Sequence, residues 1–171
     1  MTYRIVKYGD PVLEKPAAPI TEFGTPELEQ LVADMFDTMY AHKGIGLAAP
    51  QIALSQRLTV IDVSAGEEES QKLVLINPEI IQREGSQIGE EGCLSIPGFR
   101  EDVKRAKSVT IRAQNTKGET FEVSGEDLLA RAMQHELDHL NGVLFLSHLS
   151  MLKRDLIKRK IRKLQKAGEW S

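Results

Sequence analysis

This chain of 171 residues is 41% hydrophobic and 27% charged, with a formal net charge of −3. These values predict a globular protein with one domain and a core of useful size. The slight negative charge gives no reason to expect a general affinity for DNA. A single cysteine excludes a disulfide framework and fits a reducing cytoplasm, and no apolar run approaches the length of about 18 residues that a membrane span needs.

The first half of the chain predicts a helix, a connection and two strands. Thr25 and the proline after it open the helix, with threonine as its cap. The segment 44–51 is glycine-rich, so we expect no regular element there. It is either a simple connector or a place where the backbone approaches a substrate closely. Strands are expected at 58–63 and 73–76, separated by a solvated acidic loop at 66–70.

The second half predicts a hairpin followed by a buried helix. Strands at 109–113 and 120–123 alternate in hydrophobicity and are joined by a turn. Residues 124–127 are expected to cap a helix over 128–140, and the Asn-Gly pair at 141–142 should end it. Apolar residues occur around much of this helix, which indicates that it is buried.

The chain ends in a basic amphipathic segment that predicts a helix from Ser150 onward. Ile157, Ile161 and Leu164 form its apolar stripe, and eight basic residues lie between Lys153 and Lys166. The basic face is either an ordinary solvated surface or a contact for an anionic partner such as ribosomal RNA.

The strongest chemical signal is the motif H-E-x-x-H, which spans 135–139 of the predicted buried helix. Residues four apart lie on one helix face, about 5–6 Å apart at Cβ, so His135 and His139 can bind the same metal ion. Glu136 can reach a metal-bound water without being a ligand, which suits a general base. The alternative, two surface histidines beside an unrelated acid, fits a buried helix poorly because buried polar groups need partners.

A catalytic site of this kind needs a third protein ligand. Cys93 is a candidate, because acids and a glycine precede it and a Pro-Gly turn signal follows it, although most free cysteines are small buried hydrophobes. His148, nine residues after His139, leaves open a zinc endopeptidase with a downstream ligand. A structural metal site in a ribosome-binding protein is a third reading, but the chain has no second cysteine to close it.

Three segments together resemble peptide deformylase of the compact bacterial type. They are 44–51 (GIGLAAPQ), 91–95 (EGCLS) and 134–139 (QHELDH), in the order and at about the spacing of that family. The resemblance implies a metal-dependent hydrolase that removes the N-formyl group from the N-terminal methionine of new proteins and releases formate. We therefore expect one catalytic domain over 1–171, with residues 153–171 as its basic C-terminal helix.

The expected fold class is α+β. Small antiparallel or mixed β-sheets should pack around a central buried helix that carries H-E-x-x-H, with an N-terminal and a C-terminal helix beside them. The expected metal ligands are Cys93, His135 and His139, with Glu136 as general base and then acid. By resemblance, the side-chain amide of Gln51 and the backbone N–H of Leu94 stabilise the oxyanion.

The resemblance also implies a set of substrate-binding residues. Backbone groups alongside the substrate main chain are expected near Ile45, Gly46 and Gly89. The wall of the methionine pocket is expected to include Leu128, Arg131 and Ala132. Arg131 departs from the apolar residue that some relatives carry, although its stem could pack while its head reaches water.

The metal and the partners follow from ligand chemistry and from the resemblance. Two imidazoles and a thiolate suit zinc, iron, cobalt or nickel. The resemblance implies Fe2+ in the cell, with Zn2+, Ni2+ or Co2+ as substitutes. It also implies N-formylmethionyl nascent peptides as substrates, the bacterial cytoplasm as the location, and docking of the basic C-terminal helix to the ribosome near the exit tunnel.

Overall fold

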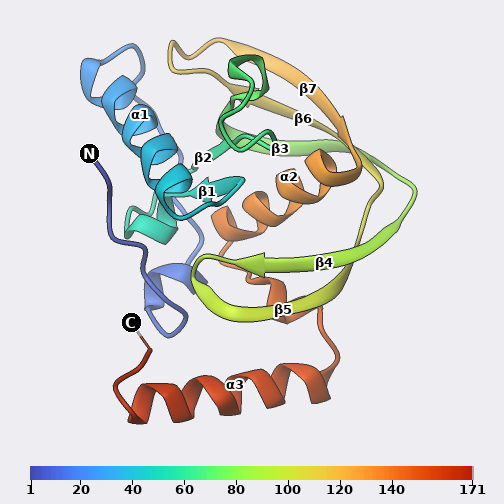
Figure 1. The fold of residues 1–171 in the computed structure, drawn as a ribbon. Coiled ribbons are helices and arrows are strands. Elements are labelled where there is room, and N and C mark those ends of the chain that lie inside the picture. Colours follow the sequence, from blue (N-terminus) through green and yellow to red (C-terminus); the bar gives the residue numbers. More distant parts are fainter. Residues whose placement is uncertain (171) are drawn as a thin grey trace.

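The computed structural model describes residues 1–170, which form three α-helices and seven β-strands. The helices are α1 (Pro26–Ala41), α2 (Asp127–Leu140) and α3 (Met151–Lys166). Figure 1 shows α2 between the larger sheet and the β4–β5 hairpin, with α1 at one side and α3 along the lower edge. None of the helices in this part of the chain is long and apolar enough to cross a membrane.

The strands form two antiparallel sheets, so the expected α+β class is confirmed. The larger sheet has the order β1-β2-β3-β6-β7. Its strands are β1 (Gly46–Ala48), β2 (Leu58–Ile61), β3 (Leu73–Glu84), β6 (Ser108–Gln114) and β7 (Thr120–Glu126). The smaller sheet pairs β4 (Gln87–Cys93) with β5 (Ile96–Arg105), and Glu91 lies opposite Glu101 in its register.

The helix boundaries follow the capping residues in the sequence. The Thr25 side chain accepts a hydrogen bond from the Leu28 N–H at 3.1 Å and opens α1. The Ser150 side chain accepts from the Lys153 N–H and opens α3. Gly142, with φ 76°, lies just past the end of α2, where the sequence predicted a stop.

Two local predictions were wrong. The glycine-rich segment contains a strand, β1, because its backbone pairs with β2, and a 3-10 helix follows at Ala49–Ile52. The expected cap at 124–127 is also absent, because Ser124 pairs with Thr110 within the β6–β7 ladder. Glu126 precedes α2 without any side-chain capping bond. The strand expected at 73–76 is longer than predicted, because β3 continues to Glu84 along β6.

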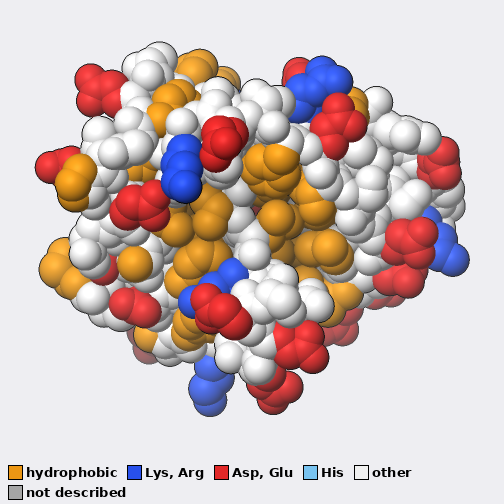
Figure 2. All heavy atoms as spheres, turned by 90° about the horizontal axis from the view of Figure 1, so that it is seen from above, with side chains coloured by type: hydrophobic (Ala, Val, Ile, Leu, Met, Phe, Trp, Pro, Cys, Tyr) orange, Lys and Arg blue, Asp and Glu red, His pale blue; other side chains and the backbone are white. Residues whose placement is uncertain are grey.

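The apolar core consists of clusters that attach each helix to the body. One face of α2, with Met133 and Leu137, packs on the larger sheet. Ile157 and Ile161 anchor α3 in a cluster with Phe145, while Leu164 stays only half-buried. On the face seen in Figure 2, apolar side chains gather in a hollowed middle region, and most charged side chains stand around it.

Candidate metal centre

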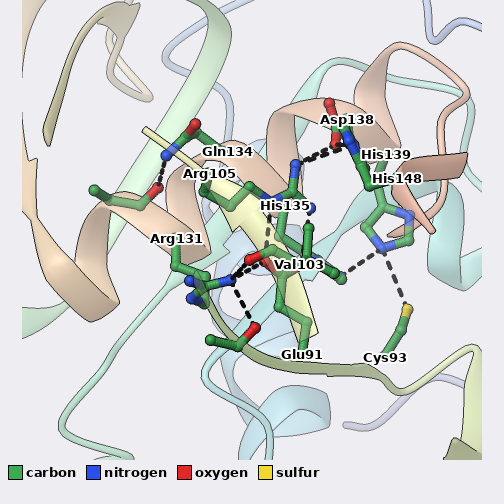
Figure 3. Close-up of polar contacts among 12 residues, drawn as sticks. Glu91, Cys93, Val103, Arg105, Arg131, Gln134, His135, Asp138, His139 and His148 are labelled. Carbon is green, nitrogen blue, oxygen red and sulfur yellow. Dashed lines mark hydrogen bonds and ion pairs between the residues drawn. The ribbon is translucent and has the colours of Figure 1, made fainter. Parts of the chain in front are cut away.

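Three metal-ligating side chains converge where α2 faces the end of β4. His135 and His139 lie one turn apart on α2, and their Nε2 atoms are 3.2 Å apart. The Cys93 Sγ, at the end of β4, is 3.3 Å from the His139 Nε2 (Figure 3). All three donor atoms lie within 4.8 Å of one another. The structure thus brings together the three ligands expected from the sequence.

The chemistry of these donors fits a divalent metal ion. Burial raises the pKa of the Cys93 thiol, but the adjacent His139 and His135 outweigh this effect and lower that pKa to about 5. Burial lowers the pKa of His135, but its hydrogen bonds to Cys93 and Glu91 raise that pKa well above its usual value. The donors therefore favour a thiolate beside a protonated imidazole, and metal binding would displace that proton.

A buried carboxylate orients the first histidine. Glu91 accepts hydrogen bonds from Arg105 at 2.8 and 2.9 Å, from Arg131 at 2.6 Å and from the His135 Nδ1 at 2.9 Å. Burial raises the pKa of Glu91, but the hydrogen bonds from Arg105 and His135 outweigh it and hold that pKa far below its usual range. Glu91 thus stays ionised and turns the Nε2 of His135 toward Cys93.

The role of Glu91 was missed in the sequence. Glu91 lies two residues before Cys93 on β4, and residues two apart on a strand share a face. That alternation was the available signal, but it required recognising β4 as a strand. Its partner Arg105 was also missed, because nothing nearby in the sequence relates it to the metal ligands.

Glu136 differs from Glu91 in having a buried oxygen without a hydrogen-bond partner among the described residues. It is 3% exposed, and its Oε1 has no hydrogen-bond partner among the described residues, as is also true of His139 Nδ1. Burial raises the pKa of Glu136 and outweighs the opposing effect of the two histidines. A Cβ on Gly46 would lie 2.7 Å from the Glu136 Oε2, so β1 can approach this carboxylate only with glycine at that position.

Gln51 is held with its amide nitrogen facing the metal ligands. Its Oε1 accepts from the Ala48 N–H at 3.0 Å. Its Nε2 is 3.2 Å from the Ser95 Oγ and 3.5 Å from the Cys93 Sγ. A donor fixed in this way can serve a developing negative charge without reorganisation.

A cavity of about 710 Å³ opens beside these groups. Of the expected site residues, its lining includes Ile45, Gly46, Gln51, Cys93, Leu94, Leu128, Arg131, Ala132, His135 and Glu136. Within residues 1–170, Gly89 is not part of that lining, and its carbonyl accepts from the Arg131 Nη1 at 3.1 Å. The cavity thus unites most of the residues that were expected to bind substrate.

The sequence suggested that the head group of Arg131 could reach water, but in the structure this group is buried. The residue is 7% exposed, and its guanidinium bonds to Glu91 and to the carbonyls of Gly89 and Val103. A Cβ on Gly89 would lie 2.9 Å from the Arg131 Nη2, so the glycine leaves the space that the guanidinium fills. The charge of Arg131 is therefore neutralised by Glu91 inside the protein.

His148 is not a third ligand. Its Nε2 lies 2.8 Å from the Asp138 Oδ2 and 3.2 Å from the Arg105 Nη1. Among the described residues, Cys93, His135 and His139 are the one group of three or more side chains that could hold a metal ion. The endopeptidase reading, which needed a downstream ligand, therefore loses its candidate.

Comparisons with known proteins place the sequence in a family. The family model for polypeptide deformylase matches residues 2–155. A peptide deformylase of Acidobacterium capsulatum is 65% identical over 166 residues, covering 97% of each chain. One of Alkalilimnicola ehrlichii is 49% identical over 164 residues, covering 96% of this chain and 91% of its own.

The fold leads to the same family. The crystal structure of a peptide deformylase from Legionella pneumophila superposes with a TM-score of 0.91 at 44% identity, covering 100% of this chain and 99% of the other. The structure of the Thermus thermophilus peptide deformylase has a TM-score of 0.87 at 42% identity, and the match covers 95% of both chains. Together with the family model, these similarities establish that the chain belongs to the polypeptide deformylase family.

Proposed function

We propose that this deformylase uses Cys93, His135 and His139 as metal ligands and Glu136 as its proton carrier. Its reaction is the metal-dependent removal of the formyl group from the N-terminal methionine of nascent proteins. The assignment of residues rests on the convergence of the three donor atoms within 4.8 Å, beside a buried carboxylate oxygen that has no partner within residues 1–170.

Groups of the protein itself transfer the protons and stabilise the developing negative charge. A divalent metal held by Cys93, His135 and His139 would supply Lewis acidity, which lowers the pKa of a bound water from about 15.7 toward about 7. Glu136 accepts a proton from the attacking water as the water oxygen adds to the formyl carbon. The Gln51 amide and the Leu94 N–H donate to the developing oxyanion, and each such donor contributes about 3 kcal/mol. Glu136 then gives its proton to the leaving amine as the C–N bond breaks, which leaves formate and a free methionyl N-terminus.

The substrate is held by the cavity beside these groups. We propose that backbone groups of Ile45 and Gly46 bind the main chain of the substrate, because Gly46 brings β1 close to Glu136. Leu128, Ala132 and the stem of Arg131 form the wall of the methionine pocket. Gly89 contributes on β4 by leaving the space that the Arg131 guanidinium fills, where that charge is paired with Glu91.

We infer that the metal in the cell is Fe2+. The mixed set of one thiolate and two imidazoles suits iron as well as zinc, nickel and cobalt, and the resemblance described above favours iron. Protein purified without oxygen should contain iron and lose activity in air. Reloading with Zn2+, Ni2+ or Co2+ measures how far each metal can replace it.

We also propose that residues 1–171 form a single catalytic domain that works in the bacterial cytoplasm and docks on the ribosome near the exit tunnel. The two sheets and the flanking helices would pack around α2 as the structural centre. Docking is supported by α3, whose Ile157 and Ile161 face the core while Lys160 and Lys163 are exposed. Changing both lysines to glutamate should weaken cosedimentation with ribosomes and spare the hydrolysis of short peptides.

The decisive test is formate release from formyl-Met-Ala-Ser by protein purified anaerobically with Fe2+. The acetylated peptide is the matched control, because its extra methyl group displaces the carbonyl and spoils the attack geometry. We expect rapid release of formate and almost no release of acetate. Internal cleavage of both peptides with the formyl group left in place would contradict the proposal.

A further inference from the structure

Trp170 links the C-terminal end of the chain to two distant segments. It is the only tryptophan in the sequence and follows α3. Its indole Nε1 donates a hydrogen bond to the Tyr8 carbonyl at 2.8 Å. Its ring meets Phe99 edge-on, with the ring centroids 6.2 Å apart at 61°. One side chain therefore holds both the N-terminal arm and the beginning of β5.

Both of these segments border the substrate cavity. Lys7, which precedes Tyr8, lines the cavity, and so does Phe99. The arm is also attached to residues beside the metal donors, because the Tyr8 N–H donates to the Ser95 carbonyl at 2.8 Å. The Ser95 side chain accepts in turn from Gln51. Trp170 thus lies behind the cavity wall without being part of its lining.

Trp170 supports the outer part of the cavity wall. Glu136 marks the buried end of the cavity, whereas Pro97, Gly98 and Arg100 on its wall are exposed. The formyl group has to reach Glu136, so the residues after methionine lie toward the exposed rim of the cavity, and Pro97, Gly98 and Arg100 are part of that rim. Phe99 is within that stretch, and Trp170 packs directly against it.

We propose that Trp170 is a positioning residue for the part of the substrate that follows the methionine. The inference rests on the deformylase site assigned above. Trp170 fixes Phe99 and Tyr8 before substrate arrives, so binding need not order these segments, and such preorganisation strengthens binding. Within residues 1–170, the hydrogen bond and the ring contact of Trp170 go to Tyr8 and Phe99 and to none of the reacting groups on α2, so its loss should raise KM for longer substrates and leave kcat nearly unchanged.

The test compares Trp170→Ala with its exposed neighbour variant Glu169→Ala on two substrates. Formyl-Met-Ala-Ser passes the outer wall, whereas formyl-methionine amide has no residue beyond the methionine. In Trp170→Ala we expect KM for the tripeptide to rise about three- to tenfold, the scale of a lost aromatic contact and hydrogen bond. KM for the amide should stay within about twofold. Trp170→Phe, which keeps a ring against Phe99, should recover part of the difference.

The opposite pattern would overturn the proposal. Equal losses on both substrates, a fall in kcat alone, or no change in KM would each show that Trp170 does not position the downstream residues. Wild-type protein that releases formate from neither substrate would instead contradict the proposed function.

A second measurement does not depend on any variant or on catalysis. Because Trp170 is the sole tryptophan, the emission of the metal-loaded wild-type protein, excited where tyrosine does not absorb, reports on the surroundings of this one side chain. The contacts of Trp170 are already formed before substrate arrives, so saturation with Met-Ala-Ser should leave the emission nearly unchanged. A large shift of the emission on binding would show that binding orders these segments, and it would overturn the proposal even if Trp170→Ala failed to fold.

Discussion

Glu91→Gln should destabilise the protein much more than Glu90→Gln, although the two residues are neighbours on β4. Glu91 is 5% exposed and accepts hydrogen bonds from Arg105, Arg131 and His135. Glu90 points the other way and pairs with Arg100, with both side chains about 60% exposed. The two substitutions make the same chemical change in opposite environments, so each is the control for the other.

The expected magnitudes follow from the partners that remain. Removing one member of a buried ion pair costs about 3–5 kcal/mol, because the other charge is left buried. Arg105 keeps Asp138 at 2.6 Å, which favours the lower end, about 3 kcal/mol. Arg131 keeps only neutral acceptors, including the carbonyls of Gly89 and Val103. An exposed pair such as Glu90–Arg100 contributes only about 0–1 kcal/mol.

Urea unfolding of the metal-free variants, followed by circular dichroism, measures this difference. About 3 kcal/mol corresponds to a melting temperature lower by about 6–12 °C for a domain of this size. Metal affinity, measured separately, should fall by about 10–100-fold in Glu91→Gln, because His135 loses the carboxylate that orients it. If the unfolding free energies of the two variants agreed within about 1 kcal/mol, the buried cluster would not stabilise the fold as argued.

Three further predictions concern single side chains. Cys93→Ala should lose stoichiometric metal and all activity, and metal analysis with normal content would contradict its role as a ligand. Glu136→Gln should keep its metal and lose at least about 100-fold in turnover, so loss of metal from the folded variant would make Glu136 a ligand instead. Burial raises the pKa of Asp62, but hydrogen bonds from Ser64 and Tyr40 outweigh it and lower that pKa below its usual value. Its stabilising contribution is therefore present above about pH 4 and is lost on further acidification, so the advantage of wild type over Asp62→Asn in unfolding free energy should shrink there. An advantage that grew on acidification would contradict this reasoning.

The parts of the fold that depend on local chemistry could be predicted from the sequence. Thr25 opens α1 with a side-chain cap as expected, since capping involves only residues three positions away, and α3 begins next to Ser150, where the sequence predicted a helix. The H-E-x-x-H spacing likewise fixes which helix face carries His135 and His139. Cys93 was identified because it is the only thiol and has an unusual local sequence, and the structure places it beside them.

The β4–β5 hairpin was not predicted, for a physical reason. Residues 87–93 contain two glycines and two acids, which have low intrinsic preference for strands. The hairpin is stabilised by pairing with β5 and by the bonds from Glu91 to Arg105 and Arg131. Those arginines lie 14 and 40 residues further along the chain, so no local pattern could reveal the contacts. The same limit explains β1, whose three residues are held by β2.

The two buried glutamates at the site show how the surroundings assign different tasks to one side chain. Glu91 is surrounded by donors that keep it ionised, so it cannot carry a proton at neutral pH and serves to orient His135. Glu136 is as deeply buried, yet its Oε1 has no partner in the described part of the chain, and burial raises the pKa of this carboxyl. A raised pKa brings a carboxylate nearer to neutrality, where it can both accept and donate a proton during turnover. If the surroundings were exchanged, Glu136 would stay ionised and could not carry a proton, and Glu91 would no longer be held ionised beside His135. The arginines that contact Glu91 and the glycine beside Glu136 are therefore needed for catalysis as much as the two carboxylates are.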